Sequence, residues 1–357
     1  MQAHGAGRDS GPGYRSLFWP VLLIGIGVIW LLASLNILST DNLNVLFRLW
    51  PLALIVIGLD ILIGRRSAAL GATIAAAAVV LALALVVAGP SLGLAPKNEV
   101  VTENRQEPIG NATSGRIVLD LGAAPTTVNA LTNTTNLVEG EFTHTGTLRW
   151  QVSGAEEKTV EVSQEDSGMR WPFFLTQGRN LRWTLGLTPR IPLSLTVDSG
   201  SGSANLNLGE LNLREVTLDT GSGALNATLP ASQERYAVRL SSGSGSVNVT
   251  IEEGADAAVQ ADTGSGSVNL TLGPNANVDA TVSSGSGSVF VDVPDGAAVR
   301  VEVQSSGSGR VRVAPEIPQI QRGEDDEGVW ETQGYSAADR KITIRVTDLG
   351  SGNLEIR

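Results

Sequence analysis

A Gly-Ser-Gly triplet that returns every 21 or 22 residues is the feature that most constrains how this chain can fold. Its first glycines are Gly200, Gly221, Gly243, Gly264, Gly285, Gly307 and Gly350, and its second glycines are Gly202, Gly223, Gly245, Gly266, Gly287, Gly309 and Gly352. The last interval, 43 residues, equals two periods, which suggests that one repeat has lost its triplet. A fixed period of this length is typical of proteins in which each unit packs only on its neighbours.

Apolar residues alternate after each triplet, as in Val247, Val249 and Ile251. Alternation with a period of two predicts strands that bury one face, and turn-rich segments separate successive strands. Because one repeat cannot bury its inner face alone, we predict an all-β solenoid, β-helix-like with single-sheet rungs. The glycines are expected to supply either a positive φ or a corner too tight for a Cβ.

Three long apolar stretches, residues 17–38, 43–64 and 68–92, precede the repeats. Each is near the roughly 20 apolar residues that a helix needs to cross a bilayer. Arg8 and Arg15 lie before the first stretch and Arg65 and Arg66 before the third, so positive charge falls on alternate sides. A long apolar run without a small-residue cleavage site argues against a signal peptide.

These observations divide the chain into four parts. We predict a cytoplasmic tail (1–16), a three-helix transmembrane domain (17–95), a linker (96–116) and an extracytoplasmic β-repeat domain (117–357). The protein is therefore expected to be a multi-pass protein of the cell membrane. Within the helices, Gly25, Gly27 and Gly58 are expected to allow close helix packing, either within the trio or against a partner.

Charge and composition exclude several classes of function. Residues 97–357 carry 20 basic and 33 acidic residues, a formal charge of −13, which argues against binding nucleic acid. The chain has no cysteine and two histidines, His4 and His144, so we expect no thiolate or histidine-based catalytic site, no metal centre and no cofactor. We predict that the protein is not an enzyme.

Outward-facing asparagines form one candidate binding surface. They recur three residues after the second glycine of four triplets, as Asn205, Asn226, Asn248 and Asn269. A flat polar array is suited to sugar or ice, whereas the structural alternative is that like side chains hydrogen-bond along the solenoid. Asp198, Asp219 and Asp262 precede their triplets by two residues, as solvated corners or, alternatively, calcium ligands.

Aromatic side chains form the second candidate surface. They cluster before the first triplet, as Trp150, Trp171, Phe173, Phe174 and Trp183. Such a density of aromatics either caps one end of a solenoid, whose strand edges would otherwise be open, or binds a ligand.

Two stretches of sequence resemble known families. The runs LFWPVLLIGIGVIWLL (17–32) and LFRLWPLALIVIGLDILIGRR (46–66) are similar to the transmembrane region of LiaI/LiaF-type envelope-stress proteins of bacteria. The run from Asn180 to Pro230 resembles the toast-rack domain, and later repeats resemble related adhesin repeats. The resemblance implies a fold and a place in the cell envelope, with a role in sensing stress or restraining a histidine-kinase pathway.

Two functions remain open. In the first, the protein is an envelope-stress signalling accessory whose helices contact a membrane histidine kinase or another envelope protein. In the second, it is a surface adhesin or scaffold whose solenoid binds cell-wall polymer or protein. In both cases the bilayer is a partner and nucleic acid is not.

Overall fold

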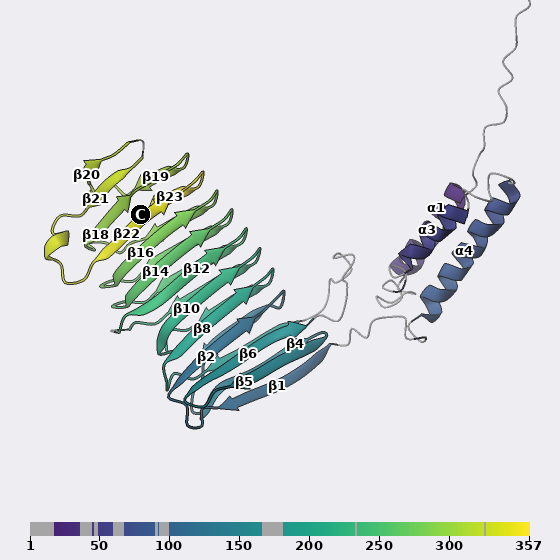
Figure 1. Ribbon diagram of the computed structural model, residues 1–357, viewed down its shortest axis with the longest axis horizontal. Helices are drawn as coiled ribbons and strands as arrows, with labels where there is room; N and C mark the ends of the chain where they lie inside the picture. Colours follow the sequence, from purple (N-terminus) through teal and green to yellow (C-terminus); the bar gives the residue numbers. More distant parts are fainter. Residues whose placement is uncertain are drawn as a thin grey trace, which may run out of the picture. The chain divides into compact units, whose positions relative to one another are not determined.

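The computed structural model describes residues 18–35, 45, 49–59, 68–89, 92, 100–165, 181–232, 234–324 and 326–357. It separates into a helical unit within residues 1–98 and a β unit that spans 99–166 and 179–357. The helical unit contains α1 (Phe18–Ser34), α3 (Trp50–Leu59) and α4 (Ala68–Ala88) (Figure 1).

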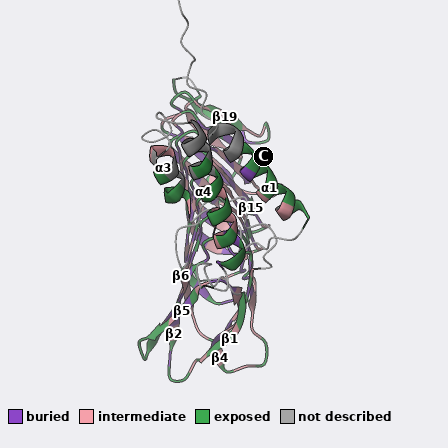
Figure 2. Cartoon of the chain, turned by 90° about the vertical axis from the view of Figure 1, so that its right-hand side faces the viewer, coloured by how far each residue is buried: buried purple, intermediate pink, exposed green. Residues whose placement is uncertain are grey.

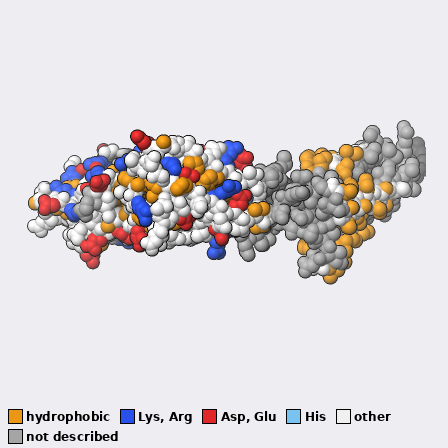
Figure 3. Space-filling view, turned by 90° about the horizontal axis from the view of Figure 1, so that it is seen from below, with side chains coloured by type: hydrophobic (Ala, Val, Ile, Leu, Met, Phe, Trp, Pro, Cys, Tyr) orange, Lys and Arg blue, Asp and Glu red, His pale blue; other side chains and the backbone are white. Residues whose placement is uncertain are grey.

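In the helical unit, α1 and α3 both contact α4. Large apolar side chains such as Trp30 and Leu31 are exposed, and the described residues of this unit are mostly hydrophobic on the face that Figure 3 shows. Among the residues described, none of the helices combines the length and hydropathy expected of a segment that crosses a membrane. The three predicted spans and their topology therefore stay predictions.

Two sheets build the β unit. Sheet A has 11 strands in the order β1 (Val101–Pro108), β4 (Asn136–His144), β7 (Arg182–Leu187), β3 (Thr126–Ala130), β9 (Ser203–Asn207), β11 (Ala224–Leu229), β13 (Ser246–Ile251), β15 (Ser267–Leu272), β17 (Ser288–Asp292), β23 (Asn353–Ile356) and β19 (Arg310–Val313). Sheet B has 12 strands in the order β20 (Gln319–Arg322), β21 (Gly328–Glu331), β18 (Val299–Val303), β22 (Ile342–Asp348), β16 (Asn277–Ser284), β14 (Asp256–Thr263), β12 (Tyr236–Ser242), β10 (Leu213–Thr220), β8 (Leu193–Ser199), β2 (Ser114–Asp120), β6 (Glu157–Glu165) and β5 (Thr147–Ser153). A 3₁₀ turn, Tyr335–Ala337, lies between β21 and β22.

Each rung gives one strand to each sheet, so the prediction of single-sheet rungs is wrong. Between β8 and β17, successive rungs pair in parallel, and equivalent residues lie opposite each other, as Leu240 lies opposite Ala261. Alternate residues of the strands from β2 and β3 to β22 and β23 are buried, whereas β1, β19, β20 and β21 contain no buried residue (burial is coloured in Figure 2). Two facing sheets are needed because the apolar side of one sheet must be covered by another layer.

The triplet forms the corner between the two strands of a rung. A Cβ added at Gly221 would lie 2.8 Å from the carbonyl oxygen of Gly200 in the rung below, and one at Gly223 would overlap the carbonyl oxygen of Gly202. Close stacking of backbone therefore explains these glycines. Positive φ accounts for the triplet glycines only at Gly307 (55°) and Gly350 (54°).

This stacking predicts a clear asymmetry within one triplet. We expect Gly223→Ala to lower the free energy of unfolding by about 1–3 kcal/mol, because backbone of the rung below must move to admit the methyl group. Ser222→Ala should change it by less than about 0.5 kcal/mol, because that side chain is exposed. Chemical denaturation of both variants measures the difference, and equal stabilities would contradict the steric account.

The last rung of the chain does not lie at the end of the solenoid. Strand β22 is inserted between β16 and β18, and β23 between β17 and β19. The interval of 43 residues is therefore not a repeat that lost its triplet. It contains the antiparallel hairpin β20–β21, which extends sheet B beyond β18.

The first rung is enclosed in the same way. Strand β2 lies between β6 and β8, and β3 lies between β7 and β9, so the excursion β4–β7 covers this end of the solenoid. The predicted linker is also corrected. Residues 101–108 form β1, which pairs with β4, and residues 114–116 already belong to β2.

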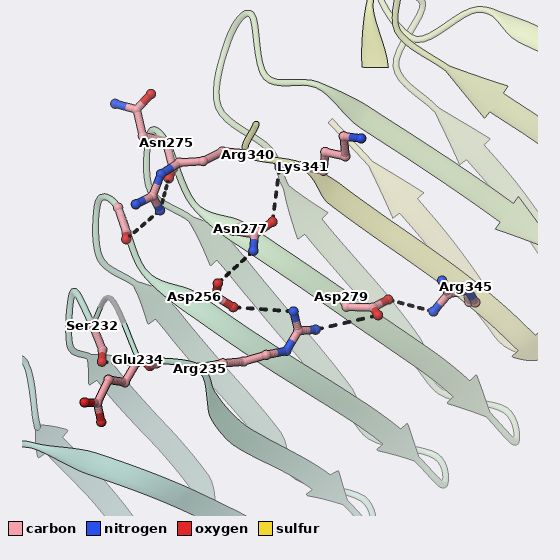
Figure 4. A network of polar contacts seen from close by, with 11 residues as sticks. Ser232, Glu234, Arg235, Asp256, Asn275, Asn277, Asp279, Arg340, Lys341 and Arg345 are labelled. Atoms are coloured by element: carbon pink, nitrogen blue, oxygen red, sulfur yellow. Dashed lines mark hydrogen bonds and ion pairs between the residues drawn. The ribbon is translucent and has the colours of Figure 1, made fainter. Parts of the chain in front are cut away.

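Polar side chains tie the inserted rung to its neighbours (Figure 4). Arg345 of β22 pairs with Asp279 of β16 at 2.7 Å and with Glu302 of β18 at 3.6 Å. Arg235 joins the same network through Asp256 at 3.4 Å and Asp279 at 3.6 Å. The network runs across sheet B and fixes the position of β22.

Candidate functional site

The outer face of sheet A carries the asparagine ladder that the sequence predicts. Amide Nδ2 donates to amide Oδ1 of the preceding rung from Asn226 to Asn205 (3.0 Å), from Asn248 to Asn226 (2.8 Å) and from Asn269 to Asn248 (2.6 Å). Phe290 follows Asn269 in the next rung and ends the column. The structural prediction of stacking is therefore met, and each amide still has one donor hydrogen directed elsewhere.

A second polar column extends the surface toward the first rung. Asn207 Nδ2 donates to Asn129 Oδ1 at 2.7 Å, so the column passes from β9 to β3. Asn129 also lines a hollow of about 660 Å³ on the face formed by β1, β4, β7 and β3. Arg105 and the apolar residues Leu131 and Leu185 contribute to its lining. Its amides and carboxylates are Asn104, Gln106, Asn129, Glu139 and Glu141.

Hydrogen bonds hold one of these carboxylates in its charged form. The hydroxyl of Thr134 donates to Glu139 at 2.6 Å and the amide of Asn136 donates at 2.8 Å. Both hydrogen bonds lower the pKa of Glu139, and the bond from Thr134 lowers it more. The hollow is therefore a hydrogen-bonding surface with fixed negative charge. Sequence analysis missed it, because β1 fell in the predicted linker.

The two aromatic candidates within the described residues, Trp150 and Trp183, pack against Phe142. Trp183 and Phe142 are fully buried, and their rings meet edge to face with centroids 5.2 Å apart. Trp150 packs at 5.8 Å on the other side of Phe142 and is half-buried. The prediction that Trp183 belongs to a binding surface is therefore wrong, because its side chain does not reach solvent. Trp171, Phe173 and Phe174 lie outside the described residues.

The acidic corners line a shallow groove. Asp219, Ser241, Asp262, Ser283 and Asp348 succeed one another along a groove of about 490 Å³ beside the first glycines of the triplets. Within the described ranges, no cluster of three or more acidic or histidine side chains is arranged to hold a metal ion. The side chain of Asp198 is exposed, but the surrounding chain removes part of its hydration. This desolvation first, and then the charges of Asp219 and Asp120, raise the pKa of Asp198.

This raised pKa gives a test of like-charge repulsion. A carboxylate with a raised folded pKa contributes stability that is present in acid and is lost as the pH rises through that pKa. We therefore expect Asp198→Asn to raise the free energy of unfolding at pH 7 by about 0.5 kcal/mol or less, because Asp198 is exposed and solvent screens it. Unfolding curves at pH 7 and pH 3 check this, with Asp295→Asn as control. A gain that persists at pH 3 would rule out repulsion.

The helix glycines differ from one another. A Cβ at Gly25 would lie 3.2 Å from both methyl carbons of Val79 on α4, so Gly25 allows α1 to approach α4. In the described part of the chain, a Cβ at Gly27 or Gly58 would meet no atom within 4 Å. Only Gly25 therefore serves packing within the described helices, and the other two leave open surface on α1 and α3.

Three family comparisons cover almost the whole chain. Residues 18–95 match the LiaF transmembrane domain, residues 96–250 match the N-terminal domain of toast-rack (DUF2154), and residues 194–356 match the toastrack family DUF4097. These families are non-enzymatic in general. The match to a transmembrane domain supports a membrane-associated protein.

Two solved structures resemble the chain. One, named "putative cell adhesion protein" and from Clostridium sporogenes ATCC 15579, is 17% identical, with a TM-score of 0.37 over 72% of this chain and 99% of its own. The other, named "putative adhesin" and from Bacteroides fragilis NCTC 9343, is 12% identical, with a TM-score of 0.35 over 73% and 99%. No curated protein matches the sequence.

Proposed function

Because this chain consists of a LiaF transmembrane domain followed by toast-rack domains, we propose that it is a signalling accessory of the bacterial cell envelope. In this proposal the three apolar stretches cross the membrane, the N-terminus is cytoplasmic and the β unit is extracytoplasmic. The helices contact a membrane histidine kinase, and the β unit responds to the state of the envelope.

The open glycines are the observation that carries this proposal. Among the described residues, a Cβ at Gly27 or Gly58 would meet no atom within 4 Å apart from its chain neighbours and its own helix backbone. Gly27 is exposed and Gly58 is half-buried, and glycine within a helix costs helix stability. In a membrane, small residues allow the backbones of two helices to come close, which is the main source of their affinity. A partner helix packed over Gly27 and Gly58 would explain glycine at these two positions.

Affinity capture from native membranes tests the proposal. We expect the full chain to retain a membrane histidine kinase, identified by mass spectrometry. Gly27→Leu and Gly58→Leu should each reduce the retained kinase about tenfold, which corresponds to a loss of about 1.4 kcal/mol. Ile26→Leu is the matched control, because Ile26 is exposed on the same helix and the change conserves volume. Retention of no kinase, or equal retention by all variants, would refute the signalling role.

The polar face of sheet A favours a second candidate, an adhesin or scaffold that binds cell-wall polymer. The ladder presents amides at the regular spacing of the rungs, and the hollow beside Asn129 adds carboxylates. Sedimentation of the full chain with purified cell wall tests it. Asn226→Ala and Asn248→Ala should each weaken binding, whereas Gln260→Ala, which removes an exposed amide from sheet B, should not. Binding that survives both ladder substitutions would exclude this surface.

A further inference from the structure

Among the described residues, strand β1 is an open edge of sheet A. It pairs on one side with β4 and ends the strand order of the sheet. Most of its eight residues are exposed, with Glu103 at 30% and Arg105 at 47% of their side-chain surface. A long edge of this kind presents unpaired backbone N–H and C=O groups to any strand that can lie beside it.

The charges of β1 select its partner. Suppose that the β1 strands of two copies pair antiparallel about a two-fold axis at Asn104. Glu103 of each copy then lies opposite Arg105 of the other copy, and Thr102 of each copy lies opposite Gln106 of the other. An axis at Glu103 would oppose two glutamates, and an axis at Arg105 would oppose two arginines. An axis at Gln106 would oppose Arg105 and Glu107, but Glu107 already pairs with Lys158 at 2.7 Å. That axis would also bring Pro108, which has no N–H to donate, opposite Asn104. Within a single chain the two side chains already lie on the same side of the strand, since Arg105 Nε donates to Glu103 at 3.1 Å. Unlike charges directly opposite each other stabilise an antiparallel pair, and like charges destabilise it.

The other open edges lack this property. In the part of the chain that the structure describes, the remaining edge strands are β5, β19 and β20. Strands β5 and β20 each carry a single charged residue, Arg149 and Arg322, and β19 carries two arginines and no acid. No two-fold axis can oppose unlike charges on any of them.

We propose that β1 is the interface of a homodimer, in which two copies pair their β1 strands antiparallel about Asn104 and join their A sheets into one. The symmetric contact is isologous, so it closes after two copies and does not propagate into fibres. Strand β1 starts six residues after the end of the LiaF-type segment, so anchoring in one bilayer raises the effective concentration of the two strands.

Disulfide trapping in native membranes tests the pairing, because the chain has no cysteine of its own. Across an antiparallel pair, Cα atoms of opposed residues lie about 4.5–5.5 Å apart, which suits a disulfide. We expect Asn104→Cys in the full chain to form a covalent dimer in more than half of the molecules after mild oxidation. Thr102→Cys should not, because its copies would lie about 13 Å apart along the strand. Co-expressed Thr102→Cys and Gln106→Cys chains should cross-link to each other.

Charge reversal provides a second readout that does not depend on the cysteine geometry alone. In the Asn104→Cys background, Arg105→Glu should reduce the dimer at least tenfold, because Glu103 then faces a glutamate. The double change Glu103→Arg with Arg105→Glu restores unlike pairs and should restore the dimer. Reversal of Arg116, an exposed ion-paired residue of β2, is the control and should have no effect.

Three results of these experiments would overturn the proposal, and a fourth concerns the mass of the adduct. These are no dimer with Asn104→Cys, equal cross-linking at Thr102 and Asn104, or a double reversal that stays monomeric. An adduct of any mass other than that of two chains would also overturn it, because the edge would then belong to a different protein. None of these results tests the proposed signalling role. That role is tested by capture of the histidine kinase, which depends on the glycines of the helices and not on β1.

Discussion

A chain that stops after residue 341 is expected to lose the folded structure of residues 294–341. This deletion removes β22 and β23, whose inward side chains are buried. They are Ile342, Ile344, Val346, Leu354 and Ile356, each at most 1% exposed. Burial of one such side chain contributes roughly 1.5–3 kcal/mol, so the combined loss is comparable with the whole net stability of a typical domain, about 5–15 kcal/mol.

The consequence is regional, since each rung depends on its immediate neighbours. Strand β18 contacts the rest of sheet B through β22, and β19 contacts sheet A through β23. The ion pairs of Arg345 with Asp279 and Glu302 are lost as well. The rungs from β8 to β13 keep all their partners and should stay folded.

Hydrogen exchange of the full and shortened chains measures this pattern. In the shortened chain we expect the backbone amides of β18, β19 and β21 to exchange completely. Over the same time, the amides of β10 and β12 should stay protected. A matched control replaces the outer hairpin β20–β21 with a short loop, which leaves β22 and β23 in place and should preserve β18. If β18 kept its protection in the shortened chain, it would have docked directly on β16, and the inserted rung would not be needed.

Replacement of Trp183 by alanine is expected to lower the free energy of unfolding by about 3–5 kcal/mol. The indole is fully buried and meets Phe142 edge to face, so the substitution leaves a cavity and removes an aromatic contact. Trp183 Nε1 has no hydrogen-bond partner among the described residues, so Trp183→Phe loses no hydrogen bond seen there and should cost less than alanine does.

Trp150→Ala is the matched control for this prediction. Trp150 touches the same Phe142 ring, but it is half-buried on the edge strand β5, so we expect a loss of about 1–2 kcal/mol. Denaturant unfolding of the three variants orders the losses. A Trp183→Ala protein as stable as the original would mean that the aromatic cluster does not support this end of the solenoid, and would reopen the ligand-binding interpretation.

Much of the candidate site could be predicted from sequence because the repeat fixes which residues are equivalent. Asn205, Asn226, Asn248 and Asn269 fall at one offset from the triplet, and parallel pairing in register then places them in a hydrogen-bonded row. The hollow beside Asn129 could not be predicted in this way. Its walls come from β1 and β4, which lie outside the periodic region and pair antiparallel.

The aromatic residues show a second limit of sequence analysis. Their density indicated either capping or binding, and both need large apolar side chains near the end of a solenoid. Burial separates the two, and it depends on which strands cover Trp183. These strands, β4 and β3, are its neighbours in sheet A, although β4 ends almost 40 residues earlier in the chain.

The sequence alone determined the repeating strands, their inward apolar faces and the corner glycines, because each follows from a local period of two within a longer period of 21 or 22 residues. Only the tertiary structure decided that the rungs form two sheets and that the last rung lies inside the solenoid. The same apolar alternation fits any neighbour with a matching inner face, so it cannot specify the order of rungs. In the structure, the buried side chains of β22 and β23 pack between the neighbouring rungs, and the excursions cover both ends. These are contacts between residues far apart in the chain.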